Sequence, residues 1–142
     1  MDAALEQARL ALTAAEVPIG AVLVIDEAIV ARAYNQPISS NDPTAHAEVL
    51  VLREAGRKVG GWRITDAVLY VTVEPCAMCA GAIVWARVPR VVYGAPDPKA
   101  GAAGSVLDVL GEPRLNFQPE VAGGLLAEEC GALLSSFFAP RR

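Results

Sequence analysis

The chain has 142 residues, of which 54% are hydrophobic, with three cysteines, one histidine and a formal net charge of −4. This length fits a single domain over residues 1–142, and no apolar run is long enough to cross a bilayer, so we expect a soluble cytoplasmic protein with no membrane contact. Three cysteines exclude a closed disulfide framework, and the acidic balance argues against an extensive nucleic-acid surface, since proteins that bind nucleic acids usually present a basic face.

The hydrophobic pattern predicts a fold in which a β-hairpin comes first and helices then alternate with strands. A helix from Asp2 to about Glu16 is indicated by its Ala, Leu, Glu and Gln content, with Leu5, Ala8 and Leu12 on one face. The other predicted elements are strands at Ile19–Ile25 and Ile29–Tyr34 around a turn at Asp26-Glu27, a loop over Asn35–Pro43, a helix from Ala45 to about Lys58, a strand at Ala67–Val73, a helix at Cys76–Arg87, a strand at Arg90–Tyr93, a loop over Gly94–Gly104, a helical piece around Val106–Leu110, a brief strand from Glu120 and a closing helix at Leu125–Phe138. This order implies α/β architecture, a three-layer α/β/α sandwich around a five-stranded mixed sheet.

One histidine and two cysteines fall at predicted helix starts. Cys76 and Cys79 lie three residues apart after Pro75, at a strand-to-helix junction, so they share one face of a first helical turn. The free backbone N–H groups of that turn and the helix dipole favour thiolate over thiol. His46, the only histidine, also falls at a predicted helix start, with Thr44 as its expected N-cap.

This combination of residue types predicts a zinc site. One His and two Cys fill three positions of a tetrahedral zinc and leave the fourth for water, which is the catalytic rather than the structural pattern. In the first turn of its helix, Glu48 converges with His46 on a point beyond the helix end and reaches that water. The order H-x-E…P-C-x-x-C is the known signature of zinc nucleobase deaminases. We therefore predict one zinc per chain, held by His46, Cys76 and Cys79.

Beyond the metal motif, nearly the whole chain resembles the bacterial tRNA-specific adenosine deaminases. The matching stretches are Glu16–Val24, Asp42–Glu48, Glu74–Ala82, Arg90–Ala95, Asp97, Lys99 with Gly101–Ser105, and the ending from Glu129-Cys130 through Phe137-Phe138. The two metal-binding motifs occur across the nucleobase deaminases. The run from Lys99 to Ser105 and the Phe-Phe ending are what single out the tRNA-editing branch.

The resemblance implies a cytidine-deaminase-like fold, conversion of adenosine to inosine at the wobble position of a tRNA anticodon, and a homodimer. It implies that Glu48 is the proton shuttle beside the three zinc ligands. The apolar stretch from Ala80 to Trp85 adds to the case for a dimer, because it carries more hydrophobic surface than one helix face needs. A helix buried between the sheet and a neighbouring helix is the simpler interpretation of the same stretch.

The resemblance also assigns residues to substrate binding. Asn35 matches a polar contact to the flipped nucleoside, and Asp97 matches a residue that faces the RNA backbone. Phe137-Phe138 and Arg141-Arg142 match the end of the last helix, which lies against the anticodon loop, although core packing of at least one phenylalanine is expected. The substrate-binding residues predicted in this way are Asn35, Ala47, Asp97, Lys99 and Phe138.

Three alternatives share part of this pattern. A zinc-dependent deaminase of a free nucleobase or nucleoside, of the guanine or cytosine type, needs no RNA surface and fits an acidic chain. Residues 1–85 hold six basic and ten acidic side chains, and residues 86–142 hold six of each. The excess of acidic side chains thus lies in the first part, and the sequence still allows local basic patches. A non-catalytic zinc module leaves Glu48 and the fourth metal position without a purpose. A thiol redox protein does not account for Pro75 together with His46.

Overall fold

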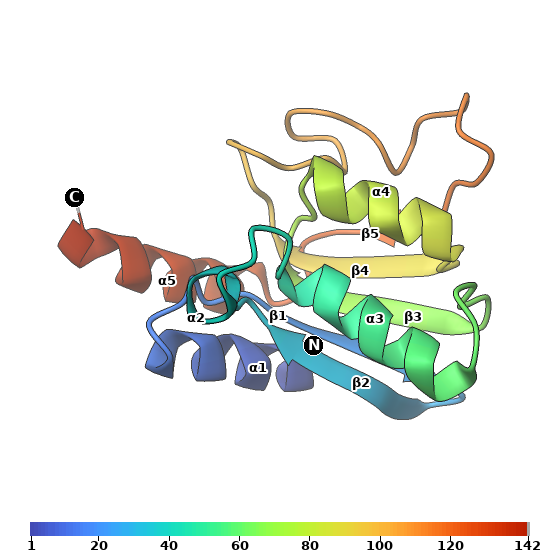
Figure 1. Ribbon diagram of the computed structural model, residues 1–142. Coiled ribbons are helices and arrows are strands. Elements are labelled where there is room, and N and C mark those ends of the chain that lie inside the picture. Colours follow the sequence, from blue (N-terminus) through green and yellow to red (C-terminus); the bar gives the residue numbers. More distant parts are fainter. Residues whose placement is uncertain (142) are drawn as a thin grey trace.

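The structure, a computed structural model, describes residues 1–141 (Figure 1). Within this part of the chain, five strands form one mixed sheet in the order β2-β1-β3-β4-β5. The elements are α1 Asp2–Thr13, β1 Gly20–Ile25, β2 Ala28–Tyr34, α2 Pro37–Ser40, α3 Ala47–Val59, β3 Ala67–Val73, α4 Ala77–Ala86, β4 Arg90–Ala95, β5 Glu120–Ala122, α5 Ala127–Phe138 and the 3-10 helix Ala139–Arg141. The predicted α/β sandwich with a five-stranded mixed sheet is confirmed. Over the residues described, no helix has both the length and the apolar character that crossing a membrane requires.

The strand directions bring several carboxyl ends to one edge of the sheet. β1 runs antiparallel to both β2 and β3, so β2 and β3 point the same way. β4 is parallel to β3, and β5 is parallel to β4. Because α3 follows β2 and α4 follows β3, the N-termini of both helices open at this shared edge (Figure 1). This is where ligand sites form in α/β sheets.

Helices cover both faces of the sheet. On one face, α3 and α4 pack side by side over a core of buried aliphatic residues that includes Leu23, Val51, Leu69, Ile83 and Val91. On the other face, α1 covers β1 and β2 while α5 covers β4 (Figure 1). A Cβ added at Gly20 would lie 2.1 Å from the carbonyl oxygen of Ala4. The start of β1 therefore has to be glycine, because α1 crosses it at backbone distance.

The hairpin and most element bounds agree with the predictions. Asp26 and Glu27 have φ values of 50° and 64°, as a two-residue type I′ turn requires, and Ile25 pairs directly with Ala28. Gly60, with φ of 77°, ends α3 as its C-cap.

Three local predictions were wrong. The expected loop over residues 35–43 contains α2, a four-residue helix that begins at Pro37, whose fixed φ suits a first helical position. The helical piece expected around residues 106–110 is not formed, because this segment turns back to make an isolated bridge between Ala103 and Asp108. α1 ends at Thr13, and its buried stripe is Ala4, Leu5, Ala8 and Ala11, with Leu12 only partly covered.

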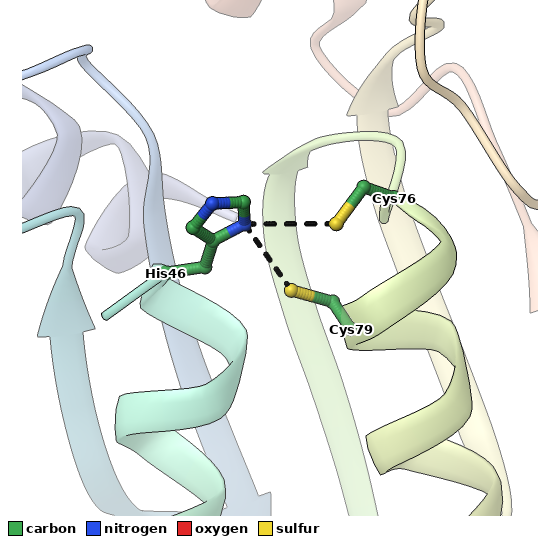
Figure 2. A group of neighbouring side chains, drawn as sticks. All are labelled: His46, Cys76 and Cys79. Carbon is green, nitrogen blue, oxygen red and sulfur yellow. Dashed lines mark hydrogen bonds between the residues drawn. The ribbon is translucent and has the colours of Figure 1, made fainter. Parts of the chain in front are cut away.

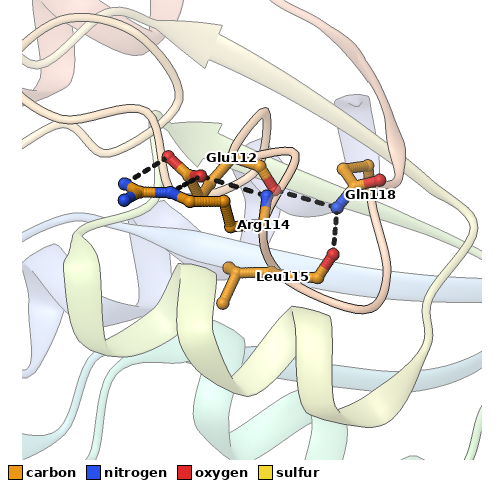
Figure 3. A network of polar contacts seen from close by, with 4 residues as sticks. All are labelled: Glu112, Arg114, Leu115 and Gln118. Atoms are coloured by element: carbon orange, nitrogen blue, oxygen red, sulfur yellow. Dashed lines mark hydrogen bonds and ion pairs between the residues drawn. The ribbon is translucent and has the colours of Figure 1, made fainter.

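The long connection between β4 and β5 passes along the α4 side of the molecule (Figure 1). Its outer part is tied locally by an ion pair of 2.6 Å between Arg114 Nε and Glu112 Oε1. The side-chain amide of Gln118 donates to the carbonyl oxygens of Glu112 and Leu115 (Figure 3). Because Arg114 is largely exposed, this ion pair contributes little stability and mainly shapes the loop.

Candidate metal centre and active site

Three metal-ligand atoms converge between the starts of α3 and α4 (Figure 2). His46 and Cys76 are the N-cap residues of the two helices, and Cys79 lies in the first turn of α4. Nδ1 of His46 is 3.6 Å from Sγ of Cys76 and 3.5 Å from Sγ of Cys79. The three atoms all lie within 4.8 Å of one another.

These separations fit a tetrahedral zinc. With Zn–N of about 2.0–2.1 Å and Zn–S of about 2.3 Å, the N–S edge of a tetrahedron is about 3.6 Å. The observed 3.5 and 3.6 Å match that edge. One imidazole and two thiolates are a donor set that zinc prefers, and three protein ligands leave the fourth position for water. His46, Cys76 and Cys79 can therefore hold a zinc ion with one coordination position left for water.

The N-cap of α3 differs from the prediction, and the difference explains why His46 is free to bind metal. Thr44 was expected to cap this helix, but its N–H and hydroxyl both donate to Asp42 Oδ1, at 2.8 and 2.7 Å. The N-cap is His46, whose side chain makes no capping hydrogen bond. The side-chain oxygen of Asn35 instead accepts the N–H of Ala47, at 2.9 Å. A residue from the end of β2 thus satisfies a helix-start N–H, and the imidazole points away from the helix toward the cysteines.

The two cysteine thiols shift each other's pKa in opposite directions. A hydrogen bond from the Cys79 thiol is the largest influence on Cys76, and together with a hydrogen bond to His46 it lowers the pKa of Cys76 to about 4, against the opposing effect of burial. The pKa of Cys79 is raised, first because its thiol donates that hydrogen bond and second because it is buried. Zinc binds cysteine as the thiolate, so the lowered pKa of Cys76 favours the form that binds the metal.

Glu48 lies in the first turn of α3 and is 4% exposed. Burial raises the pKa of its carboxyl to about 7, the Cys76 thiolate adds to the rise, and His46 opposes it. A carboxyl that titrates near neutral pH can both accept and return a proton, which is what general acid–base catalysis requires. The predicted convergence of Glu48 and the zinc ligands is therefore supported by their shared position at the two helix starts.

The remaining predicted substrate residues fall into two groups. Asp97, Lys99 and Phe138 line one cavity of about 420 Å³ between the loop after β4 and the end of α5. Asn35 and Ala47 lie instead at the start of α3, joined to each other by their hydrogen bond. Both groups sit at the carboxyl-end edge of the sheet, because Asn35 directly follows β2 and the Asp97 loop follows β4.

The end of α5 places its two phenylalanines differently. Phe137 is buried, whereas Phe138 is 42% exposed, and their rings meet edge to face with centroids 5.1 Å apart. The expectation that one of the two packs inward is confirmed. Arg141 lies with its guanidinium 3.7 Å from the centroid of the Phe137 ring and also lines the cavity. Arg142, the other predicted RNA contact at this end, lies outside the described residues.

Two buried glutamates had no role in the sequence-based interpretation. Glu16 accepts the backbone N–H groups of Ile38 and Ser39, at 3.2 and 2.6 Å, and so fixes the start of α2. Glu74, directly after β3, is 3% exposed and accepts hydrogen bonds from the loop after β4. The signal for both was a carboxylate beside strongly apolar sequence, since a buried charge requires partners.

Known proteins resemble this chain in sequence and in fold. The cytidine and deoxycytidylate deaminase zinc-binding region matches residues 1–95. A tRNA-specific adenosine deaminase of Bacillus subtilis is 51% identical over 142 residues, which is 100% of this chain and 88% of that protein. The protein of the same name from Haemophilus influenzae is 46% identical over 143 residues, which cover 100% of this chain and 83% of that protein.

Solved structures of deaminases superpose on this chain. A structure from a study of A-to-I editing by tRNA:A34 deaminases at the wobble position superposes with a TM-score of 0.92 and 47% identity, covering 94% of this chain and 97% of that one. A guanine deaminase of Bacillus subtilis superposes with a TM-score of 0.66 and 37% identity, covering 99% of this chain and 90% of that one. The match in three-dimensional structure is thus closer to the former.

Proposed function

The chain belongs to the cytidine and deoxycytidylate deaminase family, in the branch of the tRNA-specific adenosine deaminases, and from this membership we propose that it deaminates adenosine to inosine at the wobble position of a tRNA anticodon. The observation that carries the proposal is a buried glutamate beside a His-Cys-Cys ligand set at tetrahedral spacing, in a chain similar over its full length to such enzymes. The reaction consumes one water and releases ammonia.

The chemistry follows from the roles of the site residues. Zinc, when bound, lowers the pKa of a water molecule toward 7, so that a nucleophile is available at physiological pH. The two thiolates of Cys76 and Cys79 cancel the formal charge of the ion, so removal of the proton depends on a base. Glu48 accepts that proton as water attacks C6 of adenine and delivers it to N1. The same carboxyl then takes the proton of the new hydroxyl on C6 and passes it to the amino group, which leaves as ammonia while the C6 carbonyl forms.

Asn35 is proposed to orient the nucleoside. Its Oδ1 accepts the N–H of Ala47, which fixes the amide plane and leaves the NH₂ group as a donor. This donor stands at the same sheet edge as the ligands, where a base turned out of a single-stranded loop enters the site. A direct contact between Ala47 and the substrate stays a prediction. Ala47 is fully buried, and its N–H is already used in the hydrogen bond to Asn35.

The cavity formed by Asp97, Lys99 and Phe138 is proposed to hold the nucleotides that flank the target adenosine. Lys99 is exposed and positively charged, which suits a phosphate, and the exposed ring of Phe138 offers a stacking surface. Stacking of a base on an aromatic ring contributes roughly 1–3 kcal/mol, so a few such contacts offset a weak electrostatic attraction. An acidic chain can therefore bind an anticodon loop through a small local surface.

The decisive experiment is inosine formation on a transcribed tRNA that carries adenosine at the wobble position. Free adenine, guanine and cytosine are tested beside it under the same conditions. We expect inosine at the wobble position and no turnover of the free bases. Turnover of guanine without editing of tRNA would instead support the free-base alternative, which the 37% identical guanine deaminase also represents.

We also propose a homodimer that buries the outer face of α3 and α4. Trp62 and Trp85 are 59% and 67% exposed, and both line one apolar cavity of about 590 Å³ between these helices and the turn that follows α3. Ile83 on the inner side of α4 is fully buried, so the simpler interpretation of the apolar helix explains only that side. A second copy is the occupant that would remove two exposed tryptophans per chain from water.

Light scattering tests the dimer. Wild type should be dimeric at micromolar concentration, and Trp85→Glu should shift it toward the monomer because a buried carboxylate opposes association. Leu10→Glu, at a 48% exposed position on α1, is the matched control and should leave the dimer intact. A monomeric wild type would contradict the proposal.

The domain organisation and the location follow as proposals from the same evidence. Residues 1–142 are proposed to act as one deaminase domain, because the described helices pack on a single sheet. A cytoplasmic location is proposed because the substrate is tRNA.

A further inference from the structure

Glu74 is a buried carboxylate whose four hydrogen bonds all come from one distant segment. Its Oε1 accepts the N–H of Asp97 at 3.2 Å and the hydroxyl of Ser105. Its Oε2 accepts the N–H groups of Ala103 at 2.9 Å and Ser105 at 3.1 Å. These donors lie 23 to 31 residues further along the chain. A single side chain thus holds both ends of the loop formed by residues 97–105.

This loop also packs directly on the carboxylate. A Cβ at Gly101 would lie 2.4 Å from both Cδ and Oε2 of Glu74, so the loop approaches at a distance that only glycine allows. Gly101 forms an isolated β-bridge with Cys76, and the N–H of Ala102 donates to the carbonyl oxygen of Pro75 at 2.7 Å. The loop therefore runs alongside the segment that carries a zinc ligand.

Inside the loop, the side chain of Asp97 is fixed in turn. Its Oδ1 accepts the N–H groups of Lys99 and Ala100, at 3.0 and 3.2 Å, and its carbonyl oxygen accepts the N–H of Gly101. The backbone of Lys99 is therefore held, while its side chain remains exposed. Asp97 and the backbone of Lys99 are thus fixed in a loop that pairs, through Gly101, with Cys76.

We propose that Glu74 is a positioning residue that holds the loop of residues 97–105 in register with the zinc site, so that Asp97 and Lys99 meet the RNA strand next to the target adenosine. This inference rests on the proposed function for the identity of the substrate. The chemistry requires a carboxylate, because four donors need an acceptor-only group with two oxygens. Glutamine has the same size but would turn an NH₂ group toward two of the four donors.

Glu74→Gln tests the proposal through the separation of KM from kcat. Steady-state editing of a tRNA anticodon stem-loop should show KM raised about tenfold, with kcat close to wild type and zinc still at one per chain. Loss of hydrogen bonds to a charged acceptor is of this size, since tenfold corresponds to about 1.4 kcal/mol. Glu112 is a partly exposed and locally paired glutamate in the same long connection, so Glu112→Gln is the matched control and should behave as wild type.

Ser105 provides a milder second variant in case Glu74→Gln fails to fold. Ser105→Ala removes the hydroxyl donor and should raise KM, whereas Ser105→Thr keeps the hydroxyl and should restore it. A double-mutant cycle with Lys99→Ala adds a readout that a purely structural role would not move. If Glu74 acts through Lys99, the effects of Glu74→Gln and Lys99→Ala on KM should be less than additive.

Hydrogen exchange separates failure of this inference from failure of the proposed function. The amides of Asp97, Ala103 and Ser105 should exchange faster in Glu74→Gln than in wild type, whatever the substrate proves to be. Unchanged exchange, or a fall in kcat with zinc loss and unaltered KM, would overturn the positioning role. If the wild-type protein does not edit the stem-loop but the three amides still exchange faster in Glu74→Gln than in wild type, the RNA substrate alone is refuted.

Discussion

Replacing Glu48 with glutamine should lower turnover strongly without disturbing the metal or the fold. Glutamine has the size of glutamate, and at a position only 4% exposed it keeps the packing that alanine would lose. Glu48 is not among the three residues whose ligand atoms lie within 4.8 Å of one another, so zinc should stay at one per chain. The amide cannot accept and return a proton at neutral pH.

The expected loss follows from the number of proton transfers. General acid–base catalysis contributes a factor of about 10²–10⁴, and Glu48 is used both for N1 and for the departing ammonia. We therefore expect kcat to fall at least about 100-fold, which is about 2.7 kcal/mol in the activation free energy. Single-turnover inosine formation on the anticodon stem-loop measures this rate, beside metal analysis and thermal unfolding.

A matched control lies in the same helix. Glu54 of α3 is partly exposed and pairs with Lys58 at 2.9 Å, so Glu54→Gln changes the same functional group away from the site. Its editing rate and its zinc content should equal those of wild type. Residual activity of Glu48→Gln above about one hundredth of wild type, with zinc retained, would refute the proton-shuttle role.

Three further predictions concern the metal, acid stability and RNA binding. Cys79→Ala should lose most of its zinc in metal analysis, and full retention would contradict the ligand assignment. Burial alone would raise the pKa of Glu16, but the N–H groups of Ser39 and Ile38 more than offset this and leave the pKa lowered. The ionised Glu16 therefore stabilises the fold at pH values above its ordinary pKa of 4.5, and this stabilisation is lost as the pH falls through the lower pKa of the folded state. When the free energy of unfolding is measured at decreasing pH, Glu16→Gln should lose less of it than wild type does. Deletion of residues 138–142 should weaken tRNA editing strongly and leave the zinc content intact. The affinity of the full chain for tRNA should fall only shallowly with salt, because few phosphates are contacted. Undiminished editing by the truncated chain, or a steep salt dependence, would show that the C-terminal contact is misassigned.

The zinc site was predictable because its evidence is local. The spacing of Cys76 and Cys79 after Pro75, and of Glu48 after His46, depends on residues that are neighbours in sequence. Each pair sits at a helix start that the hydrophobic pattern also indicates, so the ligands and the element order follow from the same short-range information. The resemblance of nearly the whole chain to one enzyme family added the substrate class.

Only the tertiary structure decided which polar groups satisfy one another across the fold. Asn35 rather than Thr44 supports the start of α3, because the end of β2 lies beside that helix. Residues 106–110 are not helical, because the N–H groups of Val106 and Leu107 donate to the carbonyl oxygen of Gly101 and the segment bridges to Ala103. Glu74 holds a loop that starts 23 residues away, because β3 and β4 are parallel neighbours whose carboxyl ends meet. Such partners depend on strand pairing, and strand pairing is a property of the whole chain that no local pattern contains.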